Sequence, residues 1–179
     1  MLTFVSQNIN VEEWGTEVPY FIEKKLITKE YILKLLNEHL GNGSIFVTGL
    51  KVGSDNQINV FLDGDTGVTI ADCVAVSRFL EKHLDSEKND FSLDVSSHGA
   101  TTPLVMPRQY TKHIGRDFEI KLLDDTKLTG TLIEFNTNEL KLEYTERQDK
   151  VIGKGKITIT KQHIIPHNQI KESKIKLKF

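Results

Sequence analysis

The apolar pattern changes character at residues 96–103, and this change constrains the fold more than any other feature of the sequence. Before it, segments with helical spacing and segments with strand-like alternation follow one another, whereas beyond it helical spacing nearly disappears. The segment itself has no apolar period, which is typical of a connection between units. At 179 residues the chain can hold one core or two small ones, at about 150 residues per domain. We therefore expect a leader at 1–24, an N-terminal domain at 25–97, a linker at 98–103 and a C-terminal domain at 104–179.

The N-terminal part predicts a small α/β layer. Apolar residues follow helical spacing from Thr28 to about Leu40, and Gly41 stands where a helix would end. A second helix begins at Thr69, where Asp72 three residues later completes a capping-box pattern. Residues 45–52, 58–62 and 91–95 have the composition or the alternation of strands. The order helix, strand, strand, helix, strand predicts a three-stranded sheet covered by two helices.

The C-terminal part predicts strands only. Apolar residues alternate over 118–122, 128–132, 140–144, 157–159 and 175–179, with turn-forming residues between the first three segments. Five short strands in so few residues favour a small closed barrel, because closure removes exposed sheet edges. The fold class expected for the whole chain is therefore α+β, with an N-terminal α/β domain followed by a C-terminal β-barrel.

Cysteine and apolar content exclude several classes of protein. The single cysteine, Cys73, excludes an intramolecular disulfide and a cysteine-based zinc cage. No apolar run approaches the ~18 residues of a membrane span. The first lysine, Lys24, comes after Glu12, Glu13 and Glu17, so a basic-then-apolar signal sequence is not expected. We therefore expect a cytoplasmic protein.

Catalytic and metal-binding motifs are weak in this sequence. Ser97 and His98 are adjacent, but a nucleophilic triad needs groups that separate elements bring together. Asp63 and Asp65 resemble the start of a calcium loop, yet Val74 occupies the position that requires glutamate. The sequence thus predicts no catalytic residue, no metal site and no cofactor, while a hydrolase using Ser97 and His98 remains as a minor alternative.

Charge is distributed unevenly along the chain. Residues 1–103 hold 8 basic and 15 acidic side chains, whereas residues 104–179 hold 15 basic and 10 acidic ones. This division suggests two modules with different partners, and the alternative is chance variation of solvated charge. Asp63, Asp65 and Asp72 surround one loop and helix start, where carboxylates that face outward could attract a basic protein partner.

Positive charge gathers on the later strands of the C-terminal part. Such stripes on small barrels attract phosphate backbones through the release of counterions. The alternative is a solubilising face, because glutamates are interleaved with the cations. The candidate RNA-binding residues are Lys141, Arg147, Lys150, Lys154, Lys156 and Lys161.

Three segments in order resemble the bacterial ribosome maturation factor RimP family. They are 60–78, which contains the run from Gly67 to Arg78, then 93–104, and finally 115–130. The resemblance implies an α/β N-terminal domain and an SH3/Sm-like C-terminal barrel. It further implies a non-enzymatic, monomeric factor that binds the immature small (30S) ribosomal subunit and assists its assembly. Contacts with small-subunit ribosomal protein number twelve and with 16S rRNA are implied as well. The expected partner-binding residues in these segments are Arg78, Ser96, Ser97 and Gly99.

The linker departs from the family pattern at two positions. His98 stands where the family usually has proline, and Thr102 stands where it usually has arginine. An arginine-mediated anchor at that point is therefore not carried over to this chain. The alternative to an assembly factor is a stand-alone RNA-binding protein whose Sm-like barrel assembles into an oligomeric ring.

Overall fold

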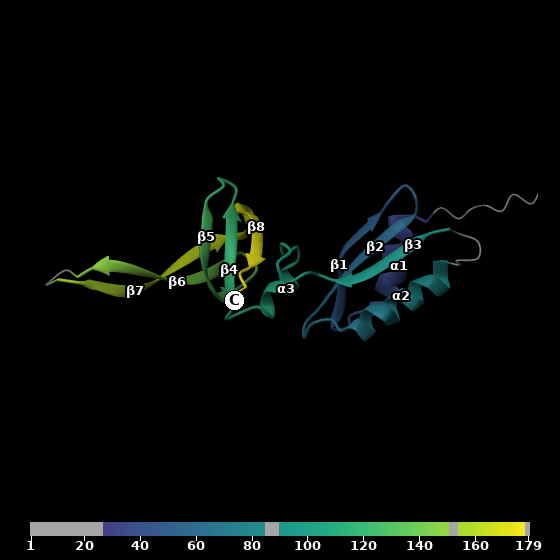
Figure 1. The fold of residues 1–179 in the computed structure, drawn as a ribbon, viewed down its shortest axis with the longest axis horizontal. Helices are drawn as coiled ribbons and strands as arrows, with labels where there is room; N and C mark the ends of the chain where they lie inside the picture. The colour runs from purple at the N-terminus through teal and green to yellow at the C-terminus, as the bar shows by residue number, and fades with distance from the viewer. Residues whose placement is uncertain (1–26, 85–89, 151–153, 178–179) are drawn as a thin grey trace, which may run out of the picture.

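Two β-sheets lie end to end in an elongated molecule (Figure 1). The structure, a computed structural model, describes residues 27–84, 90–150 and 154–177, so the expected leader at 1–24 lies outside the described residues. Each sheet has its own hydrophobic cluster, one formed by residues before 96 and one by residues from 104 onward. We refer to residues 27–97 as the N-terminal half and to residues 104–177 as the C-terminal half. Among the described residues, no helix has the length and apolar character needed to cross a membrane.

The N-terminal half is the predicted α/β layer. Its elements are α1 (Lys29–Leu40), β1 (Ile45–Val52), β2 (Gln57–Gly64), α2 (Ile70–Leu84) and β3 (Ser92–Ser97). The sheet order is β1-β2-β3, with β1 and β2 antiparallel and β2 and β3 parallel. A parallel pair needs a crossover, which α2 supplies. Both helices pack apolar faces on the sheet, with Ile32 and Leu36 from α1 and Leu80 from α2 fully buried.

Local capping chemistry fixes where the two long helices begin. The Thr28 Oγ1 accepts a hydrogen bond from the Tyr31 N–H at 3.2 Å, and α1 ends at Gly41, whose φ is +51°. At the start of α2, the Asp72 carboxylate accepts from the Thr69 N–H at 2.8 Å, and the Thr69 Oγ1 accepts from the Asp72 N–H at 3.2 Å. The capping box predicted at this position is therefore confirmed.

The C-terminal half has five strands and two short helices. They are α3 (Pro107–Thr111), β4 (Asp117–Leu122), β5 (Lys127–Phe135), β6 (Glu139–Asp149), β7 (Lys156–Pro166), η1 (His167–Gln169) and β8 (Ile170–Ile175). Four strands overlap the predicted segments, whereas the last strand, predicted at 175–179, lies at 170–175. The sheet order is β7-β6-β5-β4-β8 and its described pairs are antiparallel. Pairings among the described strands leave β7 and β8 at opposite ends of this order, so closure of the barrel stays a prediction.

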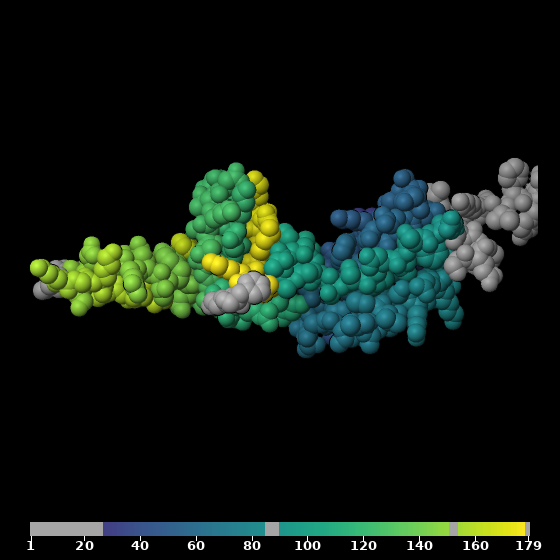
Figure 2. Space-filling view, in the orientation of Figure 1, coloured from purple at the N-terminus to yellow at the C-terminus, as the bar shows by residue number. Residues whose placement is uncertain are grey.

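The strands β6 and β7 run far beyond the sheet as a two-stranded ribbon. Pairing of β5 with β6 ends at Thr131 and Glu143, whereas pairing of β6 with β7 continues to Asp149 and Lys156. We call residues 144–150 and 154–161 the arm, which projects from the C-terminal sheet on the side opposite the N-terminal half (Figures 1 and 2). The sequence predicts shorter strands here, because most of these side chains are polar and give no clear alternation.

The helix α3 is missing from the expectations based on sequence. It has five residues, too few for an apolar period of 3.6 to be recognised. Pro107 at its first position and the buried Gln109 two residues later are the local signals. This helix lies between the two sheets, where it contacts the end of β2 (Figure 1).

Candidate functional site

A cluster of charged and polar side chains joins the two halves. Asp63 and Asp65, at and just beyond the end of β2, face Arg108, Gln109 and Lys112, which come from α3 and its C-terminal end. We call these five residues the seam. Because α3 presents cations where β2 ends in carboxylates, opposite charges from the two halves meet in the seam.

Asp63 is the buried centre of the seam. One carboxylate oxygen accepts from the Gln109 Nε2 at 2.8 Å, and the other accepts from the Lys112 ammonium and from the Gly64 N–H. Burial works to raise the pKa of Asp63, but the hydrogen bonds from Lys112, Gln109 and Gly64 outweigh it and hold that pKa below its usual value. Asp63 is therefore ionised in the folded protein and satisfied by internal donors.

Asp65 forms the exposed edge of the seam. The Arg108 guanidinium binds its carboxylate through two hydrogen bonds, of 2.7 Å from Nε and 2.5 Å from Nη2, and donates a third to the Gly43 carbonyl at 2.8 Å. The guanidinium also lies over the Phe46 ring, 4.5 Å from its centroid. The hydrogen bonds from Arg108 lower the pKa of Asp65. This fork geometry fixes the orientation of α3 relative to β1 and β2.

Backbone geometry at Gly64 places both carboxylates. A Cβ atom added there would lie 2.4 Å from the Gly67 carbonyl oxygen, so the loop after β2 closes only around a glycine. The Lys112 ammonium donates to the Gly64 carbonyl at 2.9 Å, which ties the same turn to α3. The tight turn at residues 63–67 thus places Asp63 and Asp65 where α3 can bind them.

The three aspartates expected to attract a basic partner all have internal roles. Asp63 and Asp65 are bound by α3, and Asp72 caps α2. The expectation that the Asp63 carboxylate faces outward is wrong, because Asp63 is only 7% exposed. No local pattern predicts the partner of Asp63, since Lys112 lies 49 residues away along the chain.

His98 ties the linker to the N-terminal half. Its N–H donates to the Leu62 carbonyl at 2.7 Å, while its ring nitrogens lie 3.1 Å from the Thr48 Oγ1 and 3.0 Å from the Pro103 carbonyl oxygen. Both ring nitrogens therefore have partners other than Ser97, which leaves the hydrolase alternative without its base. His98 thus connects the linker to β1.

A cavity of about 240 Å³ lies beside the seam and is lined by several of the predicted partner-binding residues. Ser97 and Gly99 line it from the linker side, and His113 lines it from the C-terminal half. His113 is buried and its Nδ1 has no hydrogen-bond partner among the described residues. Burial, with the nearby charges of Lys112 and Arg116, lowers the pKa of His113 to about 4. The imidazole is thus neutral at pH 7.

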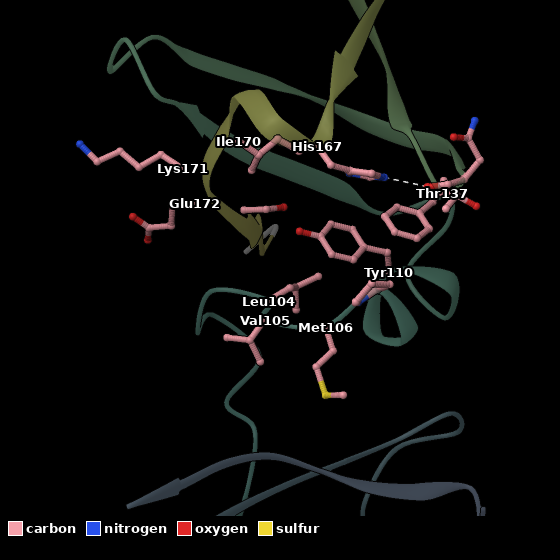
Figure 3. Close-up of a pocket in the computed structure, with 13 residues that line it drawn as sticks. Leu104, Val105, Met106, Tyr110, Thr137, His167, Ile170, Lys171 and Glu172 are labelled. Carbon is pink, nitrogen blue, oxygen red and sulfur yellow. Dashed lines mark hydrogen bonds between the residues drawn. The ribbon is translucent and has the colours of Figure 1, made fainter.

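A larger cavity of about 690 Å³ opens beside α3 (Figure 3). Tyr110 stacks on Phe135 with ring centroids 4.6 Å apart, and Phe135 lies against His167 at 4.9 Å. The His167 Nε2 donates to the Asn136 carbonyl at 2.7 Å, so this polar group is already satisfied. Apolar side chains and rings dominate the lining, which suits an apolar group better than an ion. The remaining lining residues include Leu104, Val105, Met106 and Ile170.

The other predicted partner-binding residues lie apart from the seam. Arg78 is exposed on α2, whereas Ser96 and Ser97 form the end of β3. The structure therefore brings Asp63, Ser97 and Gly99 to one cavity and leaves Arg78 outside it.

The predicted RNA-binding cations fall into two groups. Lys141 pairs with Glu134 at 2.8 Å and Lys161 pairs with Glu146 at 2.5 Å. The other four are exposed and form no ion pair with another described residue; they are Arg147, Lys150, Lys154 and Lys156. All four belong to the arm. The glutamates interleaved with them in the sequence, on which the alternative of a solubilising face depends, form no ion pair with these four cations among the described residues. Within the described chain, no group of three or more histidine, cysteine or carboxylate side chains is arranged to hold a metal ion.

Comparison with known proteins identifies the family. The family model for the RimP N-terminal domain matches residues 37–101. A protein of Christiangramia forsetii named ribosome maturation factor RimP is 45% identical over 138 residues, which are 77% of this chain and 90% of that protein. The chain belongs to the RimP family.

Other members confirm that the likeness spans both halves. The ribosome maturation factor RimP of Flavobacterium psychrophilum is 37% identical over 146 residues, covering 81% of this chain and 94% of that protein. The protein of the same name from Porphyromonas gingivalis is 32% identical over 148 residues, covering 83% and 97%. The resemblance to the RimP family that the sequence motifs indicate is thereby confirmed.

Proposed function

We propose that this protein is a non-enzymatic factor in the maturation of the ribosome that binds the immature small subunit. The observation that carries the proposal is the 45% identity to a ribosome maturation factor RimP over 90% of that protein's length. A match of 138 residues is longer than either half and therefore extends into both. The proposal also includes an SH3/Sm-like character for the C-terminal half and a monomeric state.

We further propose contacts with small-subunit ribosomal protein number twelve and with 16S rRNA. The unpaired cations of the arm support an RNA contact, because phosphate groups attract unpaired cations most strongly. For the protein contact, Ser97 and Gly99 remain exposed at the linker, and Arg78 remains exposed on α2. Asp63 is left out of this contact because α3 already satisfies it.

Co-sedimentation tests the proposal. Purified full-length protein is mixed with immature small subunits, mature small subunits or intact ribosomes and separated on sucrose gradients. We expect the protein to travel with the immature small subunits and not with intact ribosomes. Recovery only at the top of all three gradients would overturn the proposal. Light scattering on the free protein distinguishes a monomer from the ring of the alternative, which would be about six or seven times heavier.

A further inference from the structure

The arm has two faces with different chemistry. Residues directly opposite in an antiparallel pair lie on the same face, so the pairing of Leu142 with His163 extends the buried face of the sheet along the arm. We call this the inner face and the opposite one the outer face. The inner face of the arm carries Tyr144, Glu146, Gln148, Ile157, Ile159 and Lys161. The outer face carries Thr145, Arg147, Asp149, Lys156, Thr158 and Thr160.

Contacts within the inner face stiffen the arm. At its base, Tyr144 stacks on His163 with centroids 4.1 Å apart and planes inclined by 7°. Further out, the Lys161 ammonium donates to the Glu146 carboxylate at 2.5 Å, and the Gln148 amide donates to the same carboxylate at 3.3 Å. A two-stranded ribbon is only marginally stable alone, so cross-strand contacts of this kind are what keeps it extended.

The outer face has no such internal role. Its six side chains are all exposed, and none forms a hydrogen bond or ion pair with another described residue. With Lys150 and Lys154 near the tip, residues 145–160 of this face and tip hold four cations and one carboxylate. The same face carries the hydroxyl groups of three threonines: Thr158 lies opposite Arg147, and Thr145 and Thr160 lie opposite one another nearer the sheet. The outer face therefore keeps its donors and its positive charge available for a partner.

The chemistry of the outer face selects the class of partner. Protein interfaces have an apolar or aromatic centre, and the six outer-face side chains offer neither. Unpaired bases are held by stacking on aromatic rings, which this face also lacks. A-form RNA presents phosphates and 2′-hydroxyls across a wide, shallow minor groove, and these match cations interleaved with hydroxyls.

We propose that the outer face of the arm binds double-helical RNA through its phosphates and 2′-hydroxyl groups. Arg147 and Lys156, with Lys150 and Lys154 at the tip, contact phosphates, while Thr158 and Thr160 contact 2′-hydroxyls. The proposal deepens the proposed function, on which it rests, by assigning the rRNA contact to one face of one element and to paired rather than unpaired RNA.

Equilibrium binding of the full-length protein tests the assignment with three probes. They are a perfect RNA duplex, a DNA duplex of the same sequence and one RNA strand alone, each measured over a series of salt concentrations. We expect the RNA duplex to bind most tightly. Equal affinity for the two duplexes, or tighter binding of the single strand, would overturn the proposal.

Two sets of variants assign the contacts. The pair Arg147→Gln and Lys156→Gln should weaken RNA binding roughly ten-fold and reduce the salt slope by about one per lost phosphate contact. The control pair Lys29→Gln and Lys82→Gln removes the same charge from exposed sites on the N-terminal half and should leave the slope unchanged. An equal loss in both pairs would show that net charge alone governs binding and would overturn the assignment.

The hydroxyl contacts have their own readout. Thr158→Val with Thr160→Val keeps shape and strand propensity but removes both hydroxyls, so the preference for RNA over DNA should fall about three- to ten-fold at an unchanged salt slope. An unchanged preference would contradict the 2′-hydroxyl contact. If the arm variants bind duplex RNA normally and the protein still travels with immature small subunits, the arm assignment fails and the proposed function stands.

Discussion

The seam and the arm are both rich in charge, but they use it in opposite ways. In the seam, each carboxylate is bound by a cation or amide of α3, and Asp63 is buried with its pKa lowered. In the arm, the outer face and tip keep four cations without an ion pair among the described residues. Charge that is satisfied internally contributes to structure, whereas unpaired exposed charge is available to a partner. A count of charges along the chain does not separate these two cases.

Removing the buried carboxylate should have the largest effect. Asp63→Ala leaves the Lys112 ammonium and the buried Gln109 amide without their acceptor, which should lower the free energy of unfolding by about 3 kcal/mol. Urea unfolding followed by far-UV circular dichroism measures the change. The double variant Asp63→Ala with Lys112→Met should recover part of the loss, because it removes the uncompensated charge. A loss below about 0.5 kcal/mol in the single variant would show that the seam does not support the fold.

The buried imidazole beside the seam predicts a pH dependence. His113 has a pKa of about 4 in the folded protein, below the usual 6.5 of a histidine, so between these values the unfolded chain binds a proton that the folded protein does not. The free energy of unfolding should therefore fall as the pH drops from about 6.5 to about 4, by up to about 3 kcal/mol. The Asp63 carboxylate adds a further loss only at lower pH, because its pKa lies below 3.8.

Urea unfolding at several pH values checks this expectation. The variant His113→Phe removes the titrating group and should flatten the stability profile between pH 6.5 and 4. A wild-type profile that is already flat in this window would contradict the expectation that protonation of His113 lowers the free energy of unfolding.

The capping box at the start of α2 lies outside both the seam and the arm and provides a third test of stability. Thr69→Ala removes the acceptor of the Asp72 N–H, which should destabilise α2 and cost about 1 kcal/mol. Thr66→Ala, at an exposed position of the preceding loop, serves as the control and should change little. A change within about 0.2 kcal/mol at Thr69 would show that the cap does not contribute to the stability of α2.

The exposed edge of the seam should matter least for stability. The side chains of Arg108 and Asp65 are 40% and 46% exposed, so Asp65→Asn should lower the free energy of unfolding far less than Asp63→Ala does. The difference from Asp63→Ala, measured by the same urea unfolding, is the quantity that separates a buried from an exposed ion pair. Equal losses at Asp63 and Asp65 would mean that burial does not distinguish them.

Local patterns determined most of the secondary structure. The two long helices follow from apolar spacing and from caps at Thr28 and Thr69, and strands follow from alternation of apolar residues that the sheets bury on one face. The three family motifs were equally readable, because they are contiguous in the sequence. Elements too short or too polar for a period, α3 and the outer part of the arm, were not predicted.

Tertiary structure alone decided which polar groups are free. Asp63 and Lys112 are 49 residues apart, and no local pattern links them. The same holds for the faces of the arm, since the register of β6 with β7 decides that Glu146 shares a face with Lys161 while Arg147 lies opposite Thr158. The sequence determined where the charges stand along the chain. Their pairing depends on the folded chain bringing distant residues within hydrogen-bond distance, and for that reason only the structure separates the seam from the arm.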